Sequence, residues 1–339
     1  MSTIPTTFSD TLPSYTVIGG RERLGTTGLS AVLLNRGGRY ARRNIFHDLE
    51  KTGFDMVVSV EPEPAHYDLD ELSARFPFVR FVLVKGTISL GDQINLAVSE
   101  LDSPLFFVLW NDLKMIAGGT ARRMAERLTG TSDQGGENSP YKRLCTVPVI
   151  QNSHFDTLPT LIAPSLRRNR VKTMFVSPAC EGLPSLFPFD GAGIYDRDRF
   201  VKLGGFDGTL KNGHWQLMDF GFRDCLWGEE ISVSPTLKLS YEAEVPAIDE
   251  SGGADFCRFY LKNLAPVFKN DYAYLPLRRF PGFLFMTANG ISAAWEDFSE
   301  SRRWVHTNRF RWRCDPKTFT GNWNLDAAEE YFFRENGGT

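Results

Sequence analysis

The sequence predicts an α/β fold, in which a mostly parallel sheet carries helices on both faces. Short runs that are apolar throughout, such as Leu29–Leu34 and Val79–Val84, are typical of fully buried strands. Amphipathic segments of helical period separate these runs, and such alternation indicates parallel strands joined by helices. The chain has 339 residues, of which 42% are hydrophobic, so it can bury a large core.

The elements follow one another in a regular order along the first half of the chain. We expect strands over residues 29–34, 55–60, 79–84 and 104–110, and the second of these should stop at the prolines that follow it. Between them we expect a helix over residues 42–53, a short helix opened by Asp68, and a helix over residues 91–101. Further along, Asp196 should cap a short helix that ends at Gly204.

The chain divides by composition into three parts. Residues 1–15 form a polar arm, residues 16–250 carry the alternating pattern, and residues 251–339 form an extension that is aromatic and basic in patches. In this extension, the segment from Arg302 to Arg313 contains five arginines and two tryptophans but no acid. One interpretation is an interfacial surface for peripheral membrane contact. We favour the alternative, a solvated helix docked by its aromatic side chains, although no helix of clean amphipathic period is visible there.

Composition excludes several classes of protein. The net charge of −3 argues against a dedicated nucleic-acid binder. The five cysteines lie far apart, which excludes a zinc ribbon or a disulfide scaffold and fits free thiols. Neither a secretory leader nor a run long enough to span a membrane is visible. We therefore expect a cytoplasmic protein, with peripheral membrane attachment as the alternative.

Two motifs could carry chemistry. The apolar strand at residues 104–110 delivers Asn111 and Asp112 to the carboxyl edge of the sheet, where ligands of parallel sheets bind. A carboxylate there can hold Mg²⁺ or Mn²⁺ against a diphosphate, although the two residues could equally turn the chain. The second motif is a GGFD turn ending at Asp207, followed by a helix in which Asp219 and Arg223 share a face. The simple alternative for that pair is a helix salt bridge.

Together these motifs resemble the inverting family 2 glycosyltransferases of GT-A fold. A strand with an acidic tip, a later GGFD turn and a D-x-x-x-R helix occur in the family's order over residues 28–241. The helix near residue 95 agrees, with Asn95 at the family's asparagine. The resemblance implies a GT-A type nucleotide-binding sheet and transfer of a sugar from a nucleotide diphosphate-sugar to a hydroxyl of a glycan or lipid-linked acceptor, as in surface glycan synthesis.

The resemblance also implies roles for individual residues. Nucleotide contacts would come from Glu61 at the base, Asn111 at the ribose, and Asn95. Asp112 would hold the metal, Mn²⁺ or Mg²⁺. The acceptor side would comprise Asp207, Gln216 and Arg223.

Departures from the family pattern concern the catalytic base. The family's Glu-Asp pair is here Gln216-Leu217, and leucine cannot accept a proton. A histidine expected near the end of the following strand is Tyr241, and the acidic strand tip keeps one certain carboxylate. The nearest replacement bases are Asp219 and His214.

Three functions remain open at this stage. The first is an active enzyme with a displaced base, and the second is a GT-A-like protein that binds nucleotide or glycan without transfer. A nucleotidyltransferase using the basic segment at residues 36–43 is a distant third.

Overall fold

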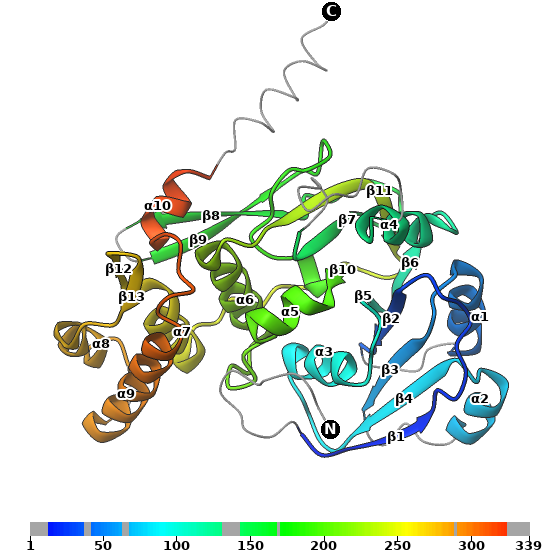
Figure 1. Cartoon of the computed structure of the whole chain (residues 1–339), viewed down its shortest axis with the longest axis horizontal. Helices are drawn as coiled ribbons and strands as arrows, with labels where there is room; N and C mark the ends of the chain where they lie inside the picture. Colours follow the sequence, from blue (N-terminus) through cyan, green and yellow to red (C-terminus); the bar gives the residue numbers. More distant parts are fainter. Residues whose placement is uncertain are drawn as a thin grey trace, which may run out of the picture.

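The computed structural model describes residues 13–36, 42–62, 68–130, 143–167, 170–287 and 290–323. Most of the predicted arm and the end of the predicted extension lie outside these residues. In the described part, nine strands form one central sheet in the order β1-β4-β3-β2-β5-β10-β7-β11-β6 (Figure 1). Their bounds are β1 Tyr15–Gly19, β2 Leu29–Leu34, β3 Val57–Pro62, β4 Val79–Val84, β5 Leu105–Trp110, β6 Leu113–Met115, β7 Cys145–Gln151, β10 Gly193–Asp196 and β11 Ile231–Tyr241.

The predicted parallel strands form one block of this sheet. Strands β4, β3, β2 and β5 pair in parallel, as do β7 and β11, whereas β1, β10 and β6 pair antiparallel with their neighbours. The bounds expected for β2 and β4 are confirmed. Strand β3 differs, because it continues through Glu61 to Pro62. Only β4 pairs with this end of β3. Pro62 has no N–H to donate, and the sheet tolerates this because one side of the strand end has no partner strand.

Helices cover both faces of the sheet. Figure 1 shows α3, α5 and α6 on one face and α1, α2 and α4 on the other. The bounds are α1 Arg42–Thr52, α2 Leu69–Arg75, α3 Leu90–Ser99, α4 Thr120–Leu128, α5 Arg197–Leu203, α6 Gly213–Trp227, α7 Gly253–Phe259, α8 Phe280–Leu284, α9 Ile291–Thr307 and α10 Pro316–Gly321. Asp196 caps α5, accepting a hydrogen bond from the backbone N–H of Arg199, and the helix ends at Gly204 in the left-handed region, as predicted. All six residues of both β2 and β5 are buried, which places the core between these two helical layers.

Smaller elements complete the structure. Strands β8 (Leu161–Arg167) and β9 (Arg170–Val176) form a separate hairpin, and β12 (Val267–Lys269) pairs with β13 (Tyr272–Tyr274). Short 3₁₀ turns lie at Phe189–Gly191 and Leu277–Arg279. A π-helical turn, Tyr260–Leu264, follows α7 directly.

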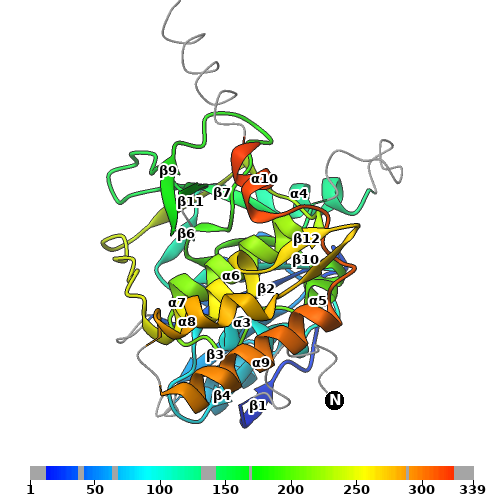
Figure 2. The ribbon, with the colours of Figure 1, turned by 90° about the vertical axis from the view of Figure 1, so that its left-hand side faces the viewer.

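The C-terminal elements pack on the α6 side of the sheet, as Figures 1 and 2 show for α7 and α9. Helix α9 begins at Ile291, and only its last turns fall within the segment singled out in the sequence. Trp304 and Trp312 are 7% and 2% exposed, and the Trp304 ring stacks on that of Trp227. This arrangement agrees with the docked helix that the sequence favours.

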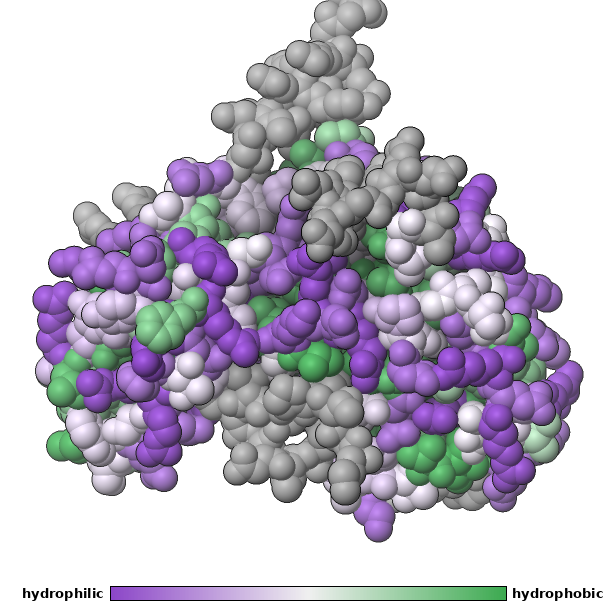
Figure 3. All heavy atoms as spheres, in the orientation of Figure 1, coloured by the Kyte–Doolittle hydropathy of each residue, from purple (hydrophilic) through white to green (hydrophobic). Residues whose placement is uncertain are grey.

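The described surface gives no sign of a membrane-spanning element. Among the helices of these residues, none combines the length and the apolar character needed to cross a bilayer. On the coloured part of the face in Figure 3, hydrophobic residues occur in small groups among hydrophilic ones.

Candidate active site

A cavity of about 420 Å³ opens at the carboxyl edge of the parallel strands. It lies between the ends of β2 and β5, the N-terminus of α6 and the segment that follows β11. Its lining comprises Arg36, Leu90, Trp110, Phe187, Phe189, Asp190, Lys211, Asn212, Gly213, His214, Leu217, Pro246, Ala247, Ile248 and Asp249. A volume of this size suits a small-molecule ligand, and the mixture of apolar walls with a few polar groups is usual for such sites.

Arg36 follows β2 and connects several parts of the cavity wall. Its backbone N–H donates to Asn111 Oδ1 at 2.9 Å, and its Nη1 lies 3.2 Å from Asp112 Oδ2. Its Nη2 forms an ion pair with Asp190 Oδ2. The guanidinium carbon lies 4.1 Å from the centre of the Trp110 ring, a cation–π arrangement. We call Arg36, Asp112, Asp190 and Tyr241 the cavity cluster; Arg36 and Asp190 line the cavity, and Asp112 and Tyr241 contact them from behind the lining.

Asp190 is held in an unusual conformation by its neighbours. Its φ is +56°, in the left-handed region that only a few per cent of non-glycine residues adopt. The Trp110 indole N–H donates to the backbone oxygen of Asp190 at 2.8 Å, and the Tyr241 hydroxyl donates to its carboxylate at 2.9 Å. Burial raises the pKa of Asp190, and the charge of Arg36 opposes this rise. Residues held in such conformations are frequent at functional sites.

The N-terminus of α6 faces the same cavity. Asn212 caps the helix, its side chain accepting a hydrogen bond from the backbone N–H of Trp215. The positive end of the helix dipole therefore points toward the ligand space, which favours an anion. His214, two residues after the cap, is partly buried, and burial lowers its pKa although Glu250 and Asp249 oppose the shift. Its imidazole is thus neutral near pH 7 and able to accept a proton.

Gln216 and Leu217, which replace the acidic pair, point in different directions. Leu217 lines the cavity. Gln216 is fully buried outside it, where its Nε2 donates to Ser89 Oγ at 2.7 Å and to the Leu210 carbonyl at 2.8 Å. Its Oε1 accepts from the Gly91 N–H at 2.9 Å. Gln216 therefore joins α6 to the start of α3, and Leu217 is the member of the pair that lines the cavity.

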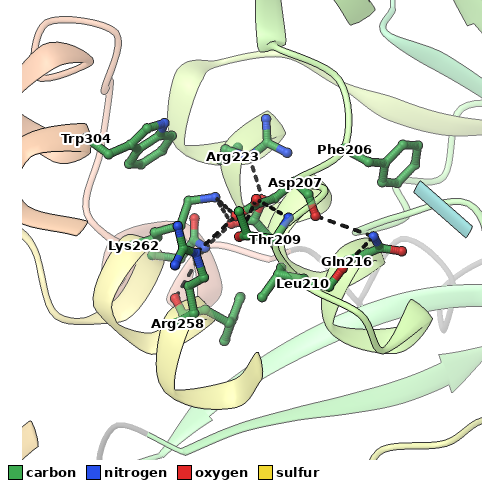
Figure 4. A network of polar contacts seen from close by, with 12 residues as sticks. Phe206, Asp207, Thr209, Leu210, Gln216, Arg223, Arg258, Lys262 and Trp304 are labelled. Carbon is green, nitrogen blue, oxygen red and sulfur yellow. Dashed lines mark hydrogen bonds and ion pairs between the residues drawn. The ribbon is translucent and has the colours of Figure 1, made fainter. Parts of the chain in front are cut away.

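A second group of charges joins α6 to the GGFD turn and to the π-helical turn, and none of its members lines the cavity. Figure 4 shows three of them, Asp207, Arg223 and Lys262. We call Asp207, Asp219, Arg223 and Lys262 the buried cluster, because all four are 0% exposed. Lys262, on the π-helical turn, lies 2.9 Å from Asp207 Oδ2 and 2.7 Å from Asp219 Oδ1. Arg223 pairs with Asp219 Oδ2 at 2.7 Å, as the spacing predicts, and also donates to the carbonyls of Leu203 and Gly205.

The buried cluster holds Asp219 in its ionised form. Burial alone would raise the pKa of this carboxyl, but the charges of Arg223 and Lys262, with hydrogen bonds from Lys262 and Asn263, lower it to about 2. A carboxylate so stabilised is a weak base, and Asp219 does not line the cavity. Of the two replacement bases predicted from the sequence, only His214 reaches the cavity.

The remaining predicted site residues have partners inside the protein. Glu61 is fully buried, 2.9 Å from Arg42 Nη2 and 2.7 Å from the Ser59 hydroxyl that donates to it. The side-chain amide of Asn95 donates to the Phe206 carbonyl at 2.9 Å, and its oxygen accepts from the Phe206 N–H at 3.0 Å. Asn95 thus fixes the GGFD turn. That turn also needs a glycine at position 205, where φ is +66° and an added Cβ would lie 2.5 Å from Asn95 Oδ1.

A comparison with solved structures identifies the architecture. GalNAc-T7, solved with UDP, GalNAc and Mn²⁺, matches with a TM-score of 0.53 and 14% identity over 88% of this chain. The chain has the GT-A fold. TarS of S. aureus (TM-score 0.47, 12% identity, 88% of this chain) and the mannosyltransferase PcManGT of Pyrobaculum calidifontis (TM-score 0.38, 10% identity, 99% of this chain) also match.

The coverage of these proteins is unequal. The match takes in 58% of the GalNAc-T7 chain, 46% of the TarS chain and 78% of the PcManGT chain. No protein-family model matches the sequence, and no curated protein matches it. The GT-A fold is therefore established from structure, in agreement with the predicted fold class.

The GT-A resemblance raises the question of a metal, because the GalNAc-T7 structure holds Mn²⁺. In the described part of this chain, no group of three or more histidine, cysteine, aspartate or glutamate side chains is placed to hold an ion. Asp112 and Asp190 both face Arg36, and Tyr241 donates its hydrogen bond to Asp190. One oxygen, Asp112 Oδ1, is buried and accepts no hydrogen bond from the described residues. These side chains do not fit a resident metal ion.

Sequence reasoning missed most of the cavity cluster as a site. Asp190 lies in a short 3₁₀ turn, and its partners come from the ends of β2, β5 and β11. In the sequence, Arg36 only begins the basic segment at residues 36–43, and Tyr241 only stands in place of the histidine of the glycosyltransferase pattern. The sequence signals for this cluster were the Asp-Gly pair at residues 190–191, which is typical of a tight turn, and Trp110 at the end of a predicted strand.

Proposed function

We propose that this chain binds a nucleotide diphosphate-sugar in the cavity and transfers the sugar to a hydroxyl of a glycan acceptor, as in surface glycan synthesis. The observation that carries the proposal is the convergence of Arg36, Lys211 and the N-terminus of α6 on one cavity at the carboxyl edge of the sheet. All three favour an anionic diphosphate. The GT-A fold, and the UDP present in the GalNAc-T7 structure, support this ligand class.

In such a transfer the acceptor oxygen attacks the anomeric carbon of the sugar. The bond from that carbon to the diphosphate oxygen breaks, and the electron pair leaves with the diphosphate. Positive groups beside the leaving group stabilise the charge that develops there. The acceptor proton must go to a base within hydrogen-bonding reach, and neutral His214 is our proposed base.

Substitution of His214 tests the catalytic part of the proposal. We expect His214→Gln to lower the rate of sugar transfer, or of donor hydrolysis, by about a hundredfold, because glutamine cannot take the proton. Release of UDP or GDP from a panel of their sugars gives the rate. The matched control is His154→Gln, an exposed histidine outside the cavity, which should retain the parent rate. Equal rates in the parent and in His214→Gln would show that the base lies elsewhere.

A specific observation favours a second function, nucleotide or glycan binding without transfer. Leu217 occupies the cavity wall next to the helix start, where it offers no acid, and Asp219 is locked in the buried cluster. If the chain only binds, nucleoside diphosphates raise its melting temperature while no nucleotide is released from any donor. Thermal-shift and release assays on the same samples therefore separate the two functions.

A further inference from the structure

Arg36 lies between two carboxylates at the cavity, those of Asp112 and Asp190. We infer that its guanidinium serves as the built-in cation of this site, so that the nucleoside diphosphate binds without a divalent metal. The inference rests on the proposed nucleotide-binding function and concerns how the diphosphate charge is met. It differs from the sequence expectation that Asp112 holds Mn²⁺ or Mg²⁺.

The first argument is the position of the guanidinium. Nη1 lies 3.2 Å from Asp112 Oδ2, and Nη2 pairs with Asp190 Oδ2, so one side chain spans both carboxylates. The backbone of Arg36 is fixed as well, since its N–H donates to Asn111 Oδ1. A metal bound by the same two carboxylates would have to displace the guanidinium from between them. The guanidinium of Arg36 therefore already neutralises part of the carboxylate charge that a divalent ion would otherwise neutralise.

The second argument is that the surrounding residues support the guanidinium. Trp110 provides a ring face 4.1 Å from the guanidinium carbon and binds the Asp190 backbone through its indole N–H. Tyr241 donates its hydroxyl hydrogen bond to Asp190 Oδ2 at 2.9 Å. Trp110 stands at the strand tip, and Tyr241 stands where the sequence leads one to expect a histidine. Tyr241, which departs from the family pattern, thus helps to hold Asp190, the partner of Arg36, in place.

The third argument concerns what the guanidinium still offers. It carries five N–H donors in a planar fork, and the two carboxylates do not use all of them. The side chain is 27% exposed and lines the cavity, so part of the fork faces the ligand space. This geometry matches phosphate oxygens, which arginine binds through paired hydrogen bonds. Lys211 and the start of α6 add positive potential at the cavity wall, which also carries the carboxylate of Asp249.

Calorimetry with and without metal tests the inference. UDP and GDP are titrated separately into metal-free protein, once with excess EDTA and once with millimolar Mn²⁺. We expect the Kd of the nucleotide that binds to differ by less than about threefold between the two buffers. Binding that requires Mn²⁺ would overturn the role of Arg36 and leave the proposed function standing. Failure of both nucleotides to bind in either buffer would overturn the proposed function, and the inference with it.

Substitution of Arg36 gives a second, independent readout. In EDTA, Arg36→Met should weaken nucleotide binding by at least about tenfold, and Arg36→Lys, which keeps the charge but not the fork, should lose less. Arg122→Met, which removes an exposed arginine of a helix ion pair, is the matched control and should bind as the parent does. Circular dichroism confirms that each variant is folded, and Arg36→Lys carries the test if Arg36→Met is not.

Mn²⁺ binding to the two carboxylates that Arg36→Met leaves unpaired provides the sharpest test of the inference. With methionine at position 36, Asp112 and Asp190 lose their shared cation, so Mn²⁺ should now bind and restore part of the nucleotide affinity. Electron paramagnetic resonance of Mn²⁺ reports this directly, because bound ions lose the signal of the free ion. Because the diphosphate itself binds Mn²⁺, each sample is compared with Mn²⁺ and nucleotide without protein. We expect a further loss of signal with Arg36→Met and none with the parent, and a further loss with the parent would contradict the inference.

Discussion

The cavity cluster and the buried cluster use the same kinds of side chain but differ in what surrounds them. In the buried cluster, the carboxylates of Asp207 and Asp219 have partners at both oxygens, and all four members are closed off from solvent. In the cavity cluster, Arg36 and Asp112 keep partial exposure, and Asp112 Oδ1 accepts no hydrogen bond within the described residues. A saturated cluster holds the fold together, whereas an unsaturated one at a cavity can receive a ligand.

The difference also shows how the motif residues are used. Asp207, Asp219 and Arg223 match the glycosyltransferase pattern in the sequence, yet the structure places them in the buried cluster. Their partner Lys262 comes from the C-terminal extension, which they tie to the sheet domain. The residues that meet the cavity come from less recognisable positions. In this chain, motif similarity therefore predicts the architecture around α6 better than it predicts which residues line the cavity.

The largest expected effect comes from breaking the buried cluster. Lys262→Met should lower the free energy of unfolding by about 3–5 kcal/mol, because it leaves two buried carboxylates without their shared cation. Urea unfolding followed by circular dichroism measures the change. Lys269→Met, an exposed lysine of the same extension, should stay within about 0.5 kcal/mol of the parent. Similar stability of the two variants would mean that the buried cluster does not hold the extension in place.

Acid should lower the stability of the protein through the buried cluster, by less than the loss of Lys262 does. The pKa of Asp219 is about 2 in the folded protein, below the ordinary value near 3.9, so the ionised form stabilises the fold above about pH 4. This contribution, roughly 2 kcal/mol, is lost as the pH falls through about 2.

Urea titrations at several acidic pH values test this dependence. Asp219→Asn should be less stable than the parent at about pH 5, and its stability should fall less steeply below about pH 4. The assignment fails if Asp219→Asn and the parent respond identically to acid.

The smallest effect concerns the cavity wall. Leu217 lines the cavity, so Leu217→Asp places a carboxylate near the proposed acceptor and should raise donor hydrolysis or transfer by about tenfold. Changing Gln216 to glutamate at the same time is unfavourable, since its amide donates to Ser89 and to the Leu210 carbonyl. Leu217→Asn, of similar size but unable to act as a base, is the control. A rate unchanged by both substitutions would remove Leu217 from the reaction site.

The sequence predicted the local features of the fold well. Strands β2 and β4, the Asp196 cap and the Asp219–Arg223 pair all follow from residues near one another in the chain. The cavity cluster could not be predicted this way, because Arg36, Trp110, Asp190 and Tyr241 meet only when four separate segments come together. The burial of Lys262 had no local signal either, since it depends on a π-helical turn and on acids some forty or more residues earlier.

Hydrogen–deuterium exchange with and without nucleoside diphosphate tests the central claim most directly, because it shows where the ligand binds. With UDP or GDP present, we predict slower exchange in the segments 110–112, 187–191, 211–217 and 246–249, each of which contains residues that line the cavity. Residues 258–264, which carry Lys262 of the buried cluster, should exchange at the same rate in both samples. Protection confined to residues 258–264, or none at the cavity wall when the nucleotide is bound, would contradict the account.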